Sequence, residues 1–67
     1  MKKEIEIGQI VVQRMNGIQG IVVAHKKTPH NSYYNKVVIH CFFAPYNSHL
    51  VGTQVELSFG DVIVLAS

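Results

Sequence analysis

Cationic and tyrosine side chains are interleaved in residues 25–36 of the chain. The binding candidates in this segment are Lys26, Lys27, His30, Tyr33, Tyr34 and Lys36. Arg14 joins them if the register of the first hairpin places it beside the lysines. Lysine neutralises phosphate and tyrosine rings stack on unpaired bases, so the pattern is typical of a nucleic-acid contact. Three lysines across a polar loop are equally typical of a solvated hairpin tip.

The charge distribution along the chain is uneven. No acidic residue lies between Glu6 and Glu56, whereas four of the six lysines and arginines and all four histidines do. The middle of the chain therefore carries only positive formal charge. The formal net charge of the whole chain is nevertheless only +2, which is modest for a nucleic-acid-binding protein.

Two aromatic residues further along are candidates for contact with a protein partner. When residues 37–43 are read as a strand, one face carries Val37, Ile39, Cys41 and Phe43, and the other carries Val38, His40 and Phe42. Only one face of a strand in a small barrel points to the core. Phe42, with Tyr46 from the following loop, is then an exposed aromatic anchor for a partner. The alternative is that loops or the chain ends cover this face.

Four histidines and one cysteine raise the question of a metal site. His25 and His30 have a tolerable ligand spacing, but the chain contains no Cys-x-x-Cys or His-x₃-His pair. His40 and Cys41 point to opposite faces of a strand, whereas zinc ligands must converge on one point. We therefore expect no metal and no cofactor, and we expect Cys41 to be a small core residue.

Groups suited to acid–base catalysis are few. Glu56 alternates outward on its strand and Asp61 lies in a turn, and neither has a second carboxylate or a histidine nearby in sequence. General acid–base catalysis needs titratable groups held in position. None of the serines has the sequence context of a nucleophile elbow. The sequence therefore predicts a protein that binds rather than an enzyme.

The elements that must position these residues are short β-strands. Runs of β-branched residues separated by Gly, Pro and Asn predict strands over residues 9–15, 18–27, 36–43, 52–58 and 62–66. Asn16-Gly17 predicts a type I′ hairpin turn, and Gly20 predicts a bulge. Loops are expected at residues 28–35 and 44–49, and a short 3₁₀ turn at residues 59–61.

Two stretches of the chain resemble a known class of small barrel. Residues 8–12 (GQIVV) lead into a Gly-x-x-Gly-x-Val step at residues 17–22, and residues 55–65 (VELSFGDVIVL) look like a strand, a short helical turn and a closing strand. This layout resembles the SH3-like barrels of the KOW and Tudor type. The resemblance implies a module that binds RNA, DNA or protein through its loops, often within transcription or translation machinery. KOW-like stretches usually carry more basic residues at the first hairpin, where residues 16–20 have none.

Chain length and pattern together define the expected fold. Five short strands in 67 residues are too few for two packed sheets of ordinary size, and a sheet that closes on itself removes its exposed edges. We expect an all-β fold, a five-stranded SH3-like barrel, as one domain over residues 1–67.

Composition indicates that part of the surface is covered by a partner. The chain is 48% hydrophobic and only 15% charged, against about 25% charged in a typical domain. The single cysteine, the absence of an apolar leader and the lack of a membrane-length apolar run predict a soluble protein of a reducing, cytoplasmic setting.

Two functional classes stay open at this point. The first is a small adaptor or inhibitor that docks on a larger protein, such as a component of nucleic-acid machinery, through Phe42 and Tyr46 with the lysines facing an acidic patch. Compact chains of this kind are common among phage and mobile-element regulators. The alternative is a KOW-like module that binds nucleic acid through residues 25–36. A homodimer is compatible with either class.

Overall fold

The protein folds as one curved antiparallel sheet. The computed structural model describes residues 5–28 and 31–66, and for residues 27–28 and 31–35 it describes only the course of the backbone. The strands are β1 (Ile10–Gln13), β2 (Gln19–Thr28), β3 (Asn31–Phe43), β4 (Gln54–Ser58) and β5 (Val62–Ala66), with 3₁₀ turns η1 (Ser48–Leu50) and η2 (Phe59–Asp61). The sheet order is β4-β3-β2-β1-β5. The prediction of an all-β fold is confirmed.

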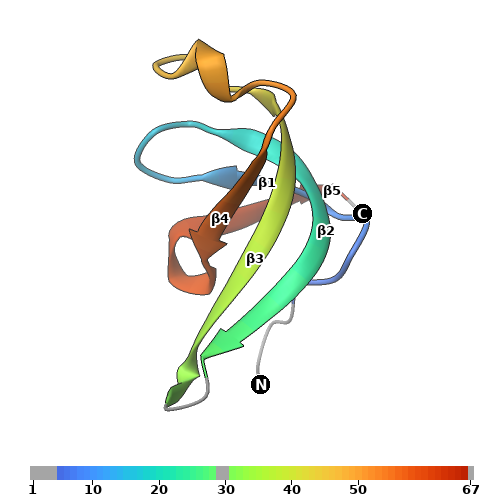
Figure 1. The fold of residues 1–67 in the computed structure, drawn as a ribbon, viewed down its shortest axis with the longest axis vertical. Helices are drawn as coiled ribbons and strands as arrows, with labels where there is room; N and C mark the ends of the chain where they lie inside the picture. Colours follow the sequence, from blue (N-terminus) through green and yellow to red (C-terminus); the bar gives the residue numbers. More distant parts are fainter. Residues whose placement is uncertain (1–4, 29–30, 67) are drawn as a thin grey trace.

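The two longest strands form the frame of the molecule. β2 and β3 run side by side as a long curved ribbon, which extends past the other strands at one end (Figure 1). β4 and β5 lie at the two edges of the sheet and are joined through η2. No ladder joins β4 to β5 within the described part of the chain, so the sheet there is open. Closure into an SH3-like barrel stays a prediction.

The expected loop at residues 28–35 is wrong, because most of it belongs to strands. β2 continues to Thr28 and β3 begins at Asn31, with Lys27 paired to Asn35 and Thr28 to Asn31. Asn, Ser and Thr suggest a loop in isolation, but the continuing ladder of the long ribbon overrides this weak local preference. Residues 29 and 30, at the tip, lie outside the described residues.

The predicted type I′ turn is also wrong. That turn needs positive φ at both Asn16 and Gly17, but only Gly17 has it, with φ of +70°. β1 ends at Gln13, whose backbone N–H donates to the Ile18 carbonyl at 2.7 Å and whose carbonyl accepts from the Gly17 N–H at 3.0 Å. The pairing of Val11 with Gly20 leaves four residues, 14–17, for the connection.

A bulge was predicted at Gly20, and the structure has it opposite that residue, on β3. The β2–β3 register shifts between Gln19 and Gly20, because Gly20 pairs with Cys41 while Gln19 pairs with Phe43. A Cβ atom at Gly20 would lie 2.5 Å from the His40 carbonyl oxygen. Glycine is therefore required here by the close approach of the two strands.

We expect Gly20→Ala to destabilise the fold by about 1–3 kcal/mol, because the added methyl group forces the neighbouring strand to move. Denaturant unfolding followed by circular dichroism measures the effect. Gly60→Ala is the matched control, since a Cβ at Gly60 meets no atom within 4 Å. Equal unfolding midpoints for the two variants would contradict the role assigned to Gly20.

The buried side chains of the core come mainly from β1, β2, β3 and β4. The fully buried ones include Val11, Val22, Val37, Ile39 and Cys41. Cys41 is thus a small core residue, as predicted.

The expectation that Phe43 faces the core is wrong. Phe42 is the extra residue of the β3 bulge, lying between the pairs Gly20–Cys41 and Gln19–Phe43, so the inside–outside alternation is broken after Cys41. Phe43 is consequently 48% exposed.

Candidate partner-binding surface

The fold distributes the predicted binding residues over three separate places. Lys26 and Lys36 face each other across the β2–β3 ribbon. Phe42 lies near the other end of β3, six residues or about 20 Å of strand beyond Lys36, and Tyr46 follows in the next connection. Of the remaining candidates, the structure describes the backbone alone for Lys27, Tyr33 and Tyr34, while His30 lies outside the described residues.

Arg14 is not close to the lysines. It lies in the connection between β1 and β2, at the opposite end of β2 from Lys26. Its backbone N–H donates to the carbonyl of Asp61, the residue that directly precedes β5, at 2.7 Å. Arg14 therefore lies next to the start of β5. The register that would have joined Arg14 to the cationic segment is therefore excluded.

The two described lysines form a mixed cluster with an acid that is remote in sequence. Lys26 Nζ donates to Glu56 Oε2 at 2.7 Å. This hydrogen bond, and then the charges of Lys26 and Lys36, hold the pKa of Glu56 below its ordinary value. β4 thus supplies a negative charge to a stretch of β2 and β3 that has none of its own, and the cluster retains one unit of net positive charge.

The lowered pKa of Glu56 leads to a pH-dependent prediction. The ion pair stabilises the folded state above the unfolded-state pKa of Glu56, and this contribution is lost as pH falls through the lower, folded-state value. The wild type should therefore melt at a higher temperature than Glu56→Gln near pH 7 in low salt, and the difference should vanish near pH 2. Thermal melts of both proteins across this range measure it. A difference independent of pH would contradict the assignment.

A second surface lies where β3 passes through η1 into β4, and we call it the aromatic end. Its members are Phe42, Phe43, Tyr46 and Val51. Tyr46 is 80% exposed and the other three are about half exposed. Figure 1 shows this connection at one extremity of the molecule, away from the tip of the β2–β3 ribbon.

Backbone hydrogen bonds hold the aromatic end in place. The Cys41 N–H donates to the Thr53 carbonyl at 2.9 Å, and the Gly52 N–H donates to the Cys41 carbonyl at 2.8 Å. The Leu50 N–H donates to the Asn47 carbonyl at 2.8 Å, which closes the turn carrying η1. The nearby β1–β2 connection lies close to the same loop, since a Cβ at Gly17 would lie 3.3 Å from Pro45 Cγ. The aromatic side chains thus project from a fixed backbone.

The aromatic end has the chemistry of an interface core. Residues 37–55 contain no Asp, Glu, Lys or Arg, and the cores of protein interfaces are depleted in charge and enriched in aromatic residues. Sequence reasoning selected Phe42 and Tyr46 but missed Phe43 and Val51. Phe43 was missed because the bulge at Phe42 breaks the inside–outside alternation and leaves Phe43 exposed. The long uncharged stretch was the signal that could have identified Val51.

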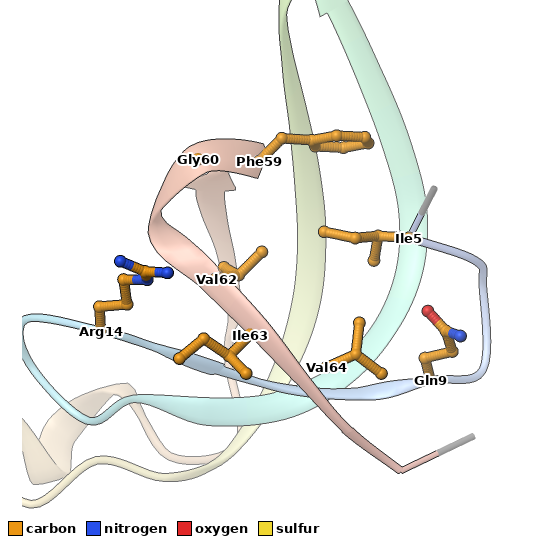
Figure 2. Close-up of a pocket in the computed structure, with 8 residues that line it drawn as sticks. All are labelled: Ile5, Gln9, Arg14, Phe59, Gly60, Val62, Ile63 and Val64. Carbon is orange, nitrogen blue, oxygen red and sulfur yellow. The ribbon is translucent and has the colours of Figure 1, made fainter. Parts of the chain in front are cut away.

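A third feature is a pocket of about 710 Å³ beside β5 (Figure 2). It is lined by Ile5, Gln9, Arg14, Phe59, Gly60, Val62, Ile63 and Val64. His25 fixes the wall formed by Ile5 and Phe59. Its Nε2 is hydrogen bonded to the Ile5 carbonyl, and its ring packs edge-on against the Phe59 ring with the two ring centroids 6.1 Å apart. The lining is mainly apolar, with the Arg14 guanidinium at one end (Figure 2).

Within residues 5–28 and 31–66, no three His, Cys, Asp or Glu side chains are placed to hold a metal ion. The described chain has no helix with the length and apolar character needed to cross a membrane. Comparison with protein-family models, with curated proteins and with solved structures gives no match. The described part of the chain is a small all-β fold with four exposed, largely aromatic side chains in a stretch of sequence that lacks charged residues.

Proposed function

We propose that this protein is a non-catalytic binding module that docks on a larger protein through its aromatic end. The observation that carries the proposal is the exposure of Phe42, Phe43, Tyr46 and Val51 at one end of the sheet, within a stretch that has no charged side chain. Burying large apolar side chains is the main favourable term in association, and aromatic anchors dominate it.

The rigidity of the aromatic end favours this use. Its backbone is fixed by the hydrogen bonds of Cys41, Gly52 and Leu50, so little backbone entropy is lost when a partner binds. The surface that complements it is apolar rather than acidic, because the lysines lie elsewhere on the sheet. A protein of nucleic-acid machinery is the partner class to test first, as the resemblance to KOW and Tudor modules implies.

Nucleic-acid binding through residues 25–36 is the less favoured function. Of the two described lysines in that segment, Lys26 already pairs with Glu56, which lowers the positive charge available to phosphate. A binding site of this type depends on several unneutralised cations.

One pair of measurements separates the two functions. The tethered protein is used to isolate a protein partner, whose affinity is then measured at several salt concentrations, and the same protein is titrated with random single-stranded and double-stranded oligonucleotides at low salt. We expect a protein complex whose affinity changes little with salt, because the aromatic end is uncharged, and no oligonucleotide complex. Oligonucleotide binding that weakens steeply with salt would overturn the proposal in favour of nucleic acid.

A further inference from the structure

The pocket beside β5 is separate from the surface to which the proposed function is assigned. None of the four side chains of the aromatic end lines it. Its volume of about 710 Å³ lies within the range of roughly 300–1,000 Å³ that is typical of small-molecule sites. Such sites are lined mainly by apolar side chains, and a few polar groups orient the ligand.

The polar side chains of the pocket lie at its two ends. Figure 2 shows the Arg14 guanidinium at one end and the Gln9 amide at the other, with the apolar side chains of Val62 and Val64 between them. Gln9 and Arg14 flank β1 and are five residues apart in the chain, about 17 Å of extended backbone. The pocket therefore offers a ligand a cation at one end and an apolar wall that stops at Gln9.

The apolar wall is held in position by contacts outside the pocket. His25 fixes Ile5 through a hydrogen bond to its carbonyl and packs its ring edge-on against Phe59. Ile5 is itself a member of the buried core. A ligand that enters the pocket thus meets a wall that is already formed, so little of the binding free energy is spent on ordering it.

The charges around the pocket favour an anion. No acidic side chain is among the described residues that line it. Arg14 contacts Asp61 through its backbone N–H and the Asp61 carbonyl. Among the side chains that the structure describes, no carboxylate lies within 4.0 Å of the Arg14 guanidinium. An anion at this end can therefore accept hydrogen bonds from the guanidinium without displacing an acid of the described chain.

We propose that the pocket binds a small monocarboxylate with an apolar chain, held with its carboxylate on Arg14 and its chain along Val62 and Val64. A guanidinium matches a carboxylate because two parallel N–H groups donate to the two oxygens. The one cation of the pocket balances the single charge of a carboxylate, whereas a phosphate ester carries up to two negative charges at neutral pH. Burial of the chain supplies affinity, and the ion pair selects the carboxylate.

Titration of the ¹⁵N-labelled full chain with hexanoate, octanoate and decanoate tests the proposal. Shifts of the Phe59, Val62 and Val64 amide signals report that the pocket is occupied. Each added methylene group should tighten binding by about two- to fourfold until the chain reaches Gln9. Octanol has a chain of the same length and no charge, and it should bind about tenfold more weakly than octanoate.

The variant Arg14→Gln separates the ion pair from the apolar contact. Arg14 is exposed, and the backbone hydrogen bond to Asp61 does not depend on its side chain, so the variant should fold. It should bind octanoate about tenfold more weakly than the wild type does and octanol equally well. Lys36→Gln removes the same charge elsewhere on the sheet and is the matched control, which should bind octanoate like the wild type. Circular dichroism confirms that both variants fold.

Four results would overturn the proposal. The first is the absence of shifts at the pocket amides with millimolar octanoate. The second is equal binding of octanoate and octanol by the wild type, which needs no variant to be observed. Equal weakening of both compounds in Arg14→Gln would show that Arg14 shapes the pocket and does not hold the carboxylate. Tighter binding of octyl phosphate than of octanoate would assign the pocket to a phosphate ester instead.

Discussion

Replacing Tyr46 with alanine is expected to weaken binding to the protein partner by about 30-fold. Tyr46 is the most exposed member of the aromatic end, and truncation of a central aromatic anchor typically removes about 2 kcal/mol of binding free energy. The side chain packs little in the free protein, so its loss should leave the melting temperature nearly unchanged. Isothermal titration of the isolated partner with wild type and variant measures the change.

Ile7→Ala is the matched control for Tyr46→Ala. Ile7 is an exposed apolar residue, 63% accessible, that precedes β1 and is not part of the aromatic end. Its truncation should leave the affinity within about twofold of the wild type. If Tyr46→Ala bound as tightly as Ile7→Ala, the aromatic end would not be the docking surface.

Replacing Ile39 with alanine is expected to destabilise the fold by about 2–5 kcal/mol, the largest stability effect that we predict. Ile39 is fully buried in β3, between Val22 of β2 and Val55 of β4. A chain of 67 residues has a total stability of only about 3–10 kcal/mol. The variant should therefore be partly unfolded at room temperature, as judged by circular dichroism and denaturant titration.

Two companion variants keep the measurement on Ile39 interpretable. Ile39→Val removes one methylene group and should lower the free energy of unfolding by about 0.5–1.5 kcal/mol, within the range of a normal titration. Ile21→Ala makes the original change at a partly exposed residue of β2 and should have a much smaller effect than Ile39→Ala. Similar losses for Ile21→Ala and Ile39→Ala would show that the core is not where we place it.

The agreement between sequence and structure is best where periodicity and local chemistry coincide. β5 matches its predicted bounds, the 3₁₀ turn η2 lies where it was expected, and the bulge predicted at Gly20 lies directly opposite it, on β3. β-branched residues and a glycine between strands specify these features locally. Residues 31–35 were assigned to a loop because their side chains favour turns, whereas cross-strand pairing with β2 holds them in a strand.

The candidate site was only partly predictable, for a related reason. Phe42 and Tyr46 were recognised from their types and from strand alternation. Phe43 was assigned to the core because alternation was assumed to continue past Cys41, and a bulge that depends on the pairing of Gly20 cannot be read from residues 37–43 alone. Lys26 and Glu56 are thirty residues apart in the chain, and they meet only because β4 pairs with β3.

The sequence by itself determined that this protein is built from short strands, that Cys41 belongs to the core, and that the chain is poor in groups for chemistry. These properties follow from residue types and from a repeat of two along each strand. Only the tertiary structure decided which strands are neighbours, that β5 lies at an apolar edge, and that the cationic and aromatic candidates are far apart. Those outcomes depend on register, and register is set by contacts between residues distant in the chain.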